Sequence, residues 1–237
     1  MITDDKITEI FCATDEFSKK FDEEIENMTL LTSDGKARRR RAASMSDSEI
    51  MTILIMFHFG TFDNFKHYYL HFIRIHLKRD FPDAVSYNRF VELESRVFFK
   101  MMFFLNLHSF GRCTDITFVD STMIPVCHNL RRYANKVFAG LATDGKGTMG
   151  WCHGFKLHFI CNDRGEIIMF CLRKRYVIEC INHLLKDKGN LVHSRHRSVN
   201  NFLMNIIAAL GAYCFFDNKP EAIQGYRIED TKQLSLF

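Results

Sequence analysis

Apolar residues recur at intervals of three and four over the first hundred residues, the spacing of one buried helix face. The first such stretch, residues 3–27, predicts an amphipathic helix with an acidic outer face. A second helix is predicted to start at the capping box Ser46-Asp-Ser-Glu49 and to end near Gly60. The N-terminal part of the chain is therefore predicted to be helical.

Two more helices are predicted, over residues 62–78 and 86–105, on either side of the break at Arg79-Asp-Phe-Pro82. The first is rich in aromatic residues and histidine, and we interpret this stripe as core packing rather than a cofactor site. Short helices beside an arginine-rich run fit either a helix-turn-helix DNA reader or a plain helical bundle. The sequence leaves both interpretations open.

After Gly111 the apolar spacing changes from helical to strand-like. We predict a strand over residues 114–120, a long loop over 121–150, and two strands over 151–160 and 166–172. The last two are joined by a turn at Cys161-Asn-Asp-Arg-Gly165, so the three strands form an antiparallel meander. Beyond Arg173 the pattern returns to helix, and a polar tail follows.

Composition fits a globular protein with one large domain or two smaller ones, since 47% of the 237 residues are hydrophobic. No apolar run is long enough to span a membrane, and the acidic N-terminus lacks the features of a signal peptide, so a cytoplasmic location is expected. The eight cysteines contain no C-x-x-C pair. A zinc site formed by these residues is excluded. Along a regular strand, Cys152 and His158 project from one face and His153 and Cys161 from the other, so the four side chains cannot converge on one ion.

The formal charge of +4 is unevenly distributed along the chain. Five cations occupy six positions in one run, and each is a candidate for contact with DNA phosphates: Lys36, Arg38, Arg39, Arg40 and Arg41. The alternative is that the run is a solvated linker.

Two carboxylates are the candidates for chemistry. Asp120 follows the strand-forming residues Ile116 to Val119. Many metal-dependent enzymes expose a catalytic acid at the end of a strand in this way. Glu179 shares a helix face with Arg175, Asn182 and Lys186 by three- and four-residue spacing. Taken alone, the pattern around Asp120 also fits a turn residue, and the pattern around Glu179 also fits an exposed, salt-bridged helix face.

Together these motifs resemble the transposases of bacterial insertion sequences, which use an Asp-Asp-Glu metal triad on a ribonuclease-H-like fold. The resemblance rests on Thr117-Phe-Val-Asp120-Ser-Thr122, the Gly154-Phe-Lys-Leu-His158 strand, the Asn-Asp-Arg-Gly turn and the helix carrying Glu179. It implies a mixed α+β fold in which a helical region precedes a truncated ribonuclease-H-like domain with a three-stranded meander and C-terminal helices. It also implies two Mg²⁺ or Mn²⁺ ions, roughly 3.5 to 4 Å apart, with Asp120 as the first metal ligand and Glu179 as the last.

The resemblance implies double-stranded DNA, at transposon ends, as the partner. The cations outside the basic run that would contact this DNA are Arg131, Arg132, Lys156, Arg175, Lys186, Arg195 and Arg197. The tyrosine that the family places three positions before Arg175 is Leu172 here. A homo-oligomer, or a mixed oligomer with an intact transposase, is a further expectation.

The chain departs from the family between Cys171 and Glu179, which only seven residues separate. The family reaches its middle aspartate through a helical crossover, and a parallel crossover alone needs about a dozen residues. The middle aspartate is therefore expected to be missing. Asp144 and Asp163 are interpreted as turn residues, and neither replaces it. The lost strand would leave Ile116 and Val119 on an unpaired edge.

We thus predict a helical, DNA-binding region over residues 1–110, a truncated transposase core over 111–216, and a polar tail over 217–237. The predicted function is DNA transposition by ancestry, with strand cleavage lost. One alternative is a non-catalytic protein that recognises transposon ends, and another is a plain helical scaffold.

Overall fold

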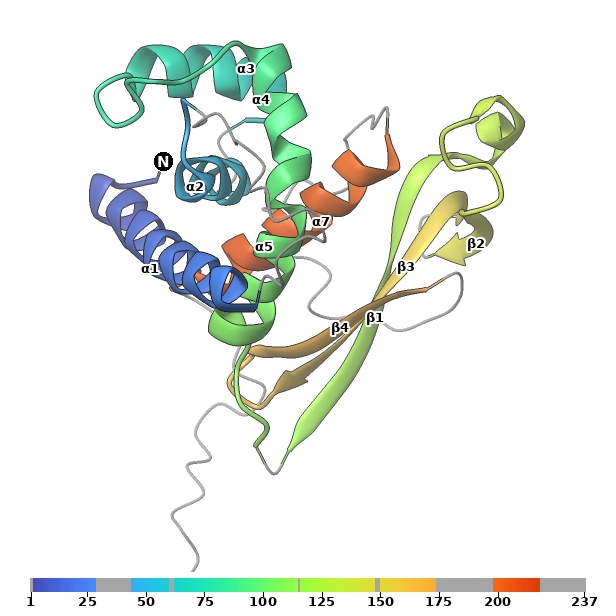
Figure 1. The fold of residues 1–237 in the computed structure, drawn as a ribbon. Coiled ribbons are helices and arrows are strands. Elements are labelled where there is room, and N and C mark those ends of the chain that lie inside the picture. The colour runs from blue at the N-terminus through green and yellow to red at the C-terminus, as the bar shows by residue number, and fades with distance from the viewer. Residues whose placement is uncertain are drawn as a thin grey trace, which may run out of the picture.

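Figure 1 shows helices on one side of the molecule and a twisted sheet on the other, with the last helix, α7 (Val199–Cys214), between them. The computed structural model describes residues 2–28, 44–59, 62–114, 116–147, 150–173 and 198–217. Helices and an antiparallel sheet are both present, so the predicted mixed α+β class is confirmed.

The first two helices, α1 (Asp4–Met28) and α2 (Asp47–Phe57), pack against each other. The predicted capping box is confirmed: the Ser46 hydroxyl accepts the Glu49 N–H, and the Glu49 carboxylate accepts the Ser46 N–H at 2.7 Å. Where the two helices touch, the Thr14 and Thr52 hydroxyls hydrogen-bond at 2.9 Å. Buried hydroxyls thus satisfy each other inside an otherwise apolar contact.

The two further predicted helices are each divided into segments. The first contains α3 (Phe65–His67) and the π-helix η1 (Tyr68–His76); the second contains α4 (Tyr87–Glu94), η2 (Ser95–Val97), α5 (Phe98–Phe104) and η3 (Leu105–Ser109). The aromatic stripe is core, as predicted, because Tyr68 and Tyr69 are fully buried. Their hydroxyls donate to the carbonyls of Ile53 and Val85.

The sheet is built around its longest strand, β3 (Gly150–Asn162). The strand β1 (Thr117–His128) pairs with β3 along one side. The other side is shared by β2 (Thr143–Gly147), which pairs with residues 150–154, and β4 (Ile167–Arg173), which pairs with 156–161. All three pairings are antiparallel, which confirms the meander.

The prediction of a loop over residues 121–150 is wrong. Strand β1 continues past Asp120 to His128, the 3-10 helix η4 (Asn129–Ala134) follows, and β2 returns along β3. Gly145 and Gly147 lie within β2. Pairing with β3 supplies the hydrogen bonds that stabilise these residues as strand, which local propensity alone does not predict.

Two parts of the sheet differ in their surroundings. We call residues 156–161 of β3, with the parts of β1 and β4 paired to them, the inner half. We call residues 128–147 and 150–153, which include η4 and β2, the tip. Gly154 lies between them, opposite Pro125, where a Cβ atom would come 2.2 Å from the Ile124 carbonyl oxygen. Only glycine permits this close approach of the two strands.

Helix α7 packs against both the helices and the sheet. Its Tyr213 hydroxyl donates to the Gly165 carbonyl in the β3–β4 turn at 2.8 Å. At its other end, Phe202 contacts the rings of Phe155 and Phe138. Buried residues of the helices and the sheet thus belong to one cluster, and the domain boundary at residue 110 stays a prediction. Within the described ranges, no helix is both long and apolar enough to cross a membrane.

Candidate functional site

Asp120 lies in the inner half of the sheet, opposite Phe159 on β3. Directly opposed residues of an antiparallel pair project from the same face, and Phe159 belongs to the core, so the Asp120 side chain is on the core-facing side. Only 8% of Asp120 is exposed. Its Oδ1 atom accepts the Ser121 N–H at 2.6 Å. The strand thus holds this carboxylate in a largely buried environment.

Two neighbours are affected by the Asp120 charge. Burial lowers the pKa of the Lys156 ammonium, and the Asp120 carboxylate opposes that shift. Burial raises the pKa of the Cys161 thiol to about 12, and the Asp120 carboxylate adds to this. Cys161 therefore stays protonated and unreactive at neutral pH. The hydroxyl of Thr122 is buried and has no hydrogen-bond partner among the described residues.

The tip holds a second charged cluster, which the sequence did not reveal. The Asp144 carboxylate on β2 accepts from the Arg132 guanidinium and contacts His153 Nδ1 at 2.8 Å. Arg132 also donates to the Tyr133 hydroxyl at 2.8 Å and lies over the Tyr133 ring, 4.6 Å from its centroid. The hydrogen bonds from His153 and Arg132 lower the pKa of Asp144. Asp144 is thus a strand residue with structural partners and not the turn residue that the sequence suggested.

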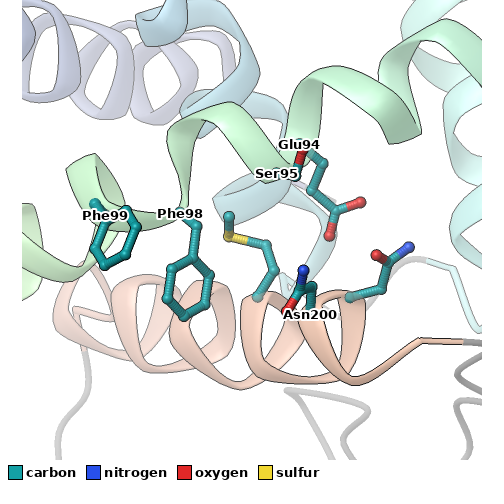
Figure 2. Close-up of a pocket in the computed structure, with 7 residues that line it drawn as sticks. Glu94, Ser95, Phe98, Phe99 and Asn200 are labelled. Carbon is teal, nitrogen blue, oxygen red and sulfur yellow. The ribbon is translucent and has the colours of Figure 1, made fainter. Parts of the chain in front are cut away.

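A pocket of about 270 Å³ lies between α4, η2, α5 and the first turn of α7 (Figure 2). Its lining residues are Glu94, Ser95, Phe98, Phe99, Asn200, Asn201 and Met204. Glu94 is 7% exposed, and burial raises the pKa of its carboxyl to about 8. At neutral pH this side chain is therefore mostly a neutral acid. None of the lining residues belongs to the sheet, so the pocket is separate from Asp120.

Comparison with known proteins shows a similarity over most of the sheet. Residues 110–172 match the family model described as Transposase DDE domain. This part of the chain is similar to a transposase DDE domain. The match includes Asp120 and nearly the whole sheet, and it ends at Leu172. The predicted resemblance is confirmed over this segment. No curated protein and no solved structure gives a significant match.

Divalent metal ions are implied by the similarity to the DDE transposase family, and the described residues do not fit a two-metal centre. Such ions need several oxygen ligands converging on one point. No group of three or more metal-ligating side chains occurs within the described ranges. Asp144 is opposite His153, six positions along β3 from the partner of Asp120, and Asp163 accepts from Thr114 at the β3–β4 turn. Asp120 therefore stands apart from both.

The other site predictions for the transposase domain have different outcomes. Glu179 and most of the predicted DNA contacts fall outside the described residues: Lys36, Arg38, Arg39, Arg40, Arg41, Arg175, Lys186, Arg195 and Arg197. Of the three that are described, Arg131 is exposed at the tip, and Arg132 is paired with Asp144. Lys156 is only 1% exposed, so it is buried rather than at the surface. Of these three, only Arg131 is exposed.

Sequence reasoning missed the tip cluster for a physical reason. Which residue Asp144 meets depends on how β2 is registered against β3, and register is not local to either strand. The only sequence cue was the alternation of small and charged residues in Thr143-Asp-Gly-Lys-Gly147, which also fits a loop.

Proposed function

We propose that this chain binds DNA as part of a transposition system and does not by itself cut or join DNA strands. The transposase DDE domain supports the first half, because enzymes with this domain act on DNA. The proposal that the chain does not cut or join DNA rests on its acidic residues. The domain retains an acid at its first strand, Asp120, and no group of three or more metal-ligating side chains occurs among the described residues.

The observation that carries the proposal is the point at which the family match ends. It stops at Leu172, and Glu179 follows after six more residues, too few for the crossover that would bring a middle aspartate beside β1. A site with fewer than three ligating side chains can bind one metal ion weakly, whereas in-line displacement at phosphorus with two ions needs ligands on both sides of the phosphate. Binding of DNA has no such requirement.

The cations of the chain support binding through the phosphate backbone. Arg131 is exposed in the structure, and the run from Lys36 to Arg41 provides five more positive charges in the sequence. Contacts of this kind release counterions, so the affinity falls steeply with salt. Double-stranded transposon ends are the expected ligand, and the chain would recognise them without processing them.

The proposal is tested with the purified full-length chain and duplexes taken from the DNA that flanks its gene. We expect binding that weakens with salt, and no strand cleavage when Mg²⁺ or Mn²⁺ is added. Replacing Arg38 to Arg41 by alanine should lower the slope of log K against log salt by about 0.9 for each phosphate that the variant no longer neutralises. Asp120→Asn should leave binding unchanged, since this buried carboxylate does not meet DNA in the proposed role.

Two results would overturn the proposal. Mg²⁺-dependent cleavage of the flanking duplexes that disappears in Asp120→Asn would establish an active transposase. Absence of binding to any duplex at low salt would favour the plain helical scaffold. A duplex of scrambled sequence serves as the control, because preference for the flanking DNA separates end recognition from general affinity for phosphates.

A further inference from the structure

Large apolar side chains are exposed together at the tip of the sheet. Tyr133 is 85% exposed, Leu130 is 84% exposed and Trp151 is 52% exposed. By contrast, the tyrosines at positions 68, 69 and 213 are fully buried. Single exposed apolar residues are ordinary, but a group of them on one part of a protein indicates a binding surface. The end of the sheet that carries β2 projects away from the helical side of the molecule (Figure 1).

Tyr133 is held in place by connected contacts, and Trp151 lies on the same face of the sheet as His153. The Arg132 guanidinium lies over the Tyr133 ring and pairs with Asp144, which in turn contacts His153. Trp151 is two positions from His153 on the same strand, so both side chains project from the same face of the sheet. A surface whose side chains are already ordered loses less conformational entropy when it binds a partner.

The charge of the tip favours an anionic partner. Residues 128–153 contain four lysines and arginines, and Asp144 is the only acid. That acid is already paired with Arg132. Arg131 and Lys136 are exposed and form no ion pair with any described residue. Two tips of like charge would repel each other, so a second copy of this chain fits the surface poorly.

We propose that the tip binds an unpaired nucleic-acid strand, with Tyr133 and Trp151 stacking on its bases and Arg131 and Lys136 contacting its phosphates. In a duplex each base is stacked on its neighbours and presents only its edges, so an aromatic ring on the protein finds no base face to cover. An unpaired strand exposes those faces. The inference rests on the proposed function in taking DNA as the partner, and it adds the form of DNA that this surface prefers.

The chain has one tryptophan, so its fluorescence reports directly on the proposed surface. The full-length protein is titrated with a thymidine oligonucleotide of about 15 nucleotides, within the site sizes of single-strand binders, and with a blunt duplex of the same length. We expect the single strand to quench Trp151 emission and to bind more tightly than the duplex. Tyr133→Ala should weaken single-strand binding by about tenfold, because base stacking on an aromatic ring contributes roughly 1 to 3 kcal/mol.

Matched variants separate stacking from charge. Phe99→Ala removes an exposed aromatic ring from α5, away from the tip, and should leave binding unchanged. Trp151→Phe keeps a ring at the site and should retain binding when the label is on the oligonucleotide. Arg131→Ala and Lys136→Ala should each reduce the salt slope by about 0.7 without abolishing the quenching. Circular dichroism checks that each variant keeps its fold.

Three results would overturn the inference, and they differ in what they say about the proposed function. Duplex binding with no quenching of Trp151 by the single strand would remove the tip inference and leave DNA binding intact. Binding of neither DNA would remove both. A change of Trp151 emission with protein concentration alone would assign the surface to self-association.

Discussion

The inner half of the sheet and its tip hold their charged side chains in opposite ways. In the inner half, Asp120 and Lys156 are buried, and burial lowers the pKa of the Lys156 ammonium. At the tip, Asp144 lies near the surface, where hydrogen bonds from His153 and Arg132 lower the pKa of its carboxyl. The same strand, β3, thus passes from a region organised by burial to one organised by polar contacts.

This difference explains which part of the sheet can take on a binding role. Charged groups placed in a packed interior are fixed by what surrounds them, and removing one partner leaves an uncompensated charge. Groups at an exposed tip can exchange protein contacts for ligand contacts at small cost. We therefore expect substitutions in the inner half to change stability, and substitutions at the tip to change binding.

The largest effect should come from truncating a core residue of the inner half. Phe159→Ala removes a fully buried ring and should lower the free energy of unfolding by about 3 to 5 kcal/mol. Trp151→Ala, on the same strand at the tip, should lower it by about half as much or less, because about half of this residue is exposed. Urea denaturation measures both. Equal losses in the two variants would contradict the division of the sheet, and Phe159→Leu provides a milder variant if the alanine variant does not fold.

A buried acid among the helices gives the next effect. Burial raises the pKa of Glu94 to about 8, so the folded state holds a proton that the unfolded state releases at a lower pH. Stability is then greatest below the unfolded pKa and falls as the pH rises toward 8, by up to about 1.4 kcal/mol for each pH unit. Glu94→Gln should remove this part of the pH dependence. The measurement is the urea midpoint of both proteins at pH 5.5 and pH 7.5.

The wild-type protein should therefore lose stability relative to the glutamine variant across this pH interval. Subtracting the two profiles cancels the contribution of the eleven histidines, which both proteins share. Parallel profiles would mean that Glu94 ionises without penalty, and that the pocket beside it admits water freely.

A smaller effect is expected where the two parts of the sheet meet. Gly154→Ala places a methyl group 2.2 Å from the Ile124 carbonyl oxygen, so the strands must separate, at a cost of about 1 to 3 kcal/mol. Hydrogen exchange should then speed up on both sides of residue 154. Gly145→Ala is the control, because its methyl group would meet only the end of the flexible Met123 side chain. Similar exchange in the two variants would show that Gly154 is not a structural boundary.

Much of the fold could be predicted because its causes are local. The capping box at Ser46 and the turn that ends at Gly165 are fixed by a few neighbouring residues, and the structure contains both. The continuation of β1 to His128 and the strand β2 were missed because they depend on pairing with β3, which is distant in sequence. Asp120 was found because an acid follows an apolar run. The contacts of Asp144 with Arg132 and His153 were not predicted, because they depend on the register of β2 against β3.

The smallest change in stability, and the most local one, should follow from Asp144→Asn. This variant removes the charge that meets Arg132 and His153 while keeping the size of the side chain. Since these ion pairs lie near the surface, the melting temperature should hardly change, whereas acrylamide should quench Trp151 more readily as the tip loosens. Because the pKa of Asp144 is lowered, acidification of the wild-type protein through that pKa should produce the same increase, which the variant should not show. Asp163→Asn changes an acid in the β3–β4 turn and should leave the quenching unaltered. If Asp144→Asn and Asp163→Asn behaved alike, the ion pairs of Asp144 would not be what orders the tip, and the stacking surface would have to be ordered by its ligand.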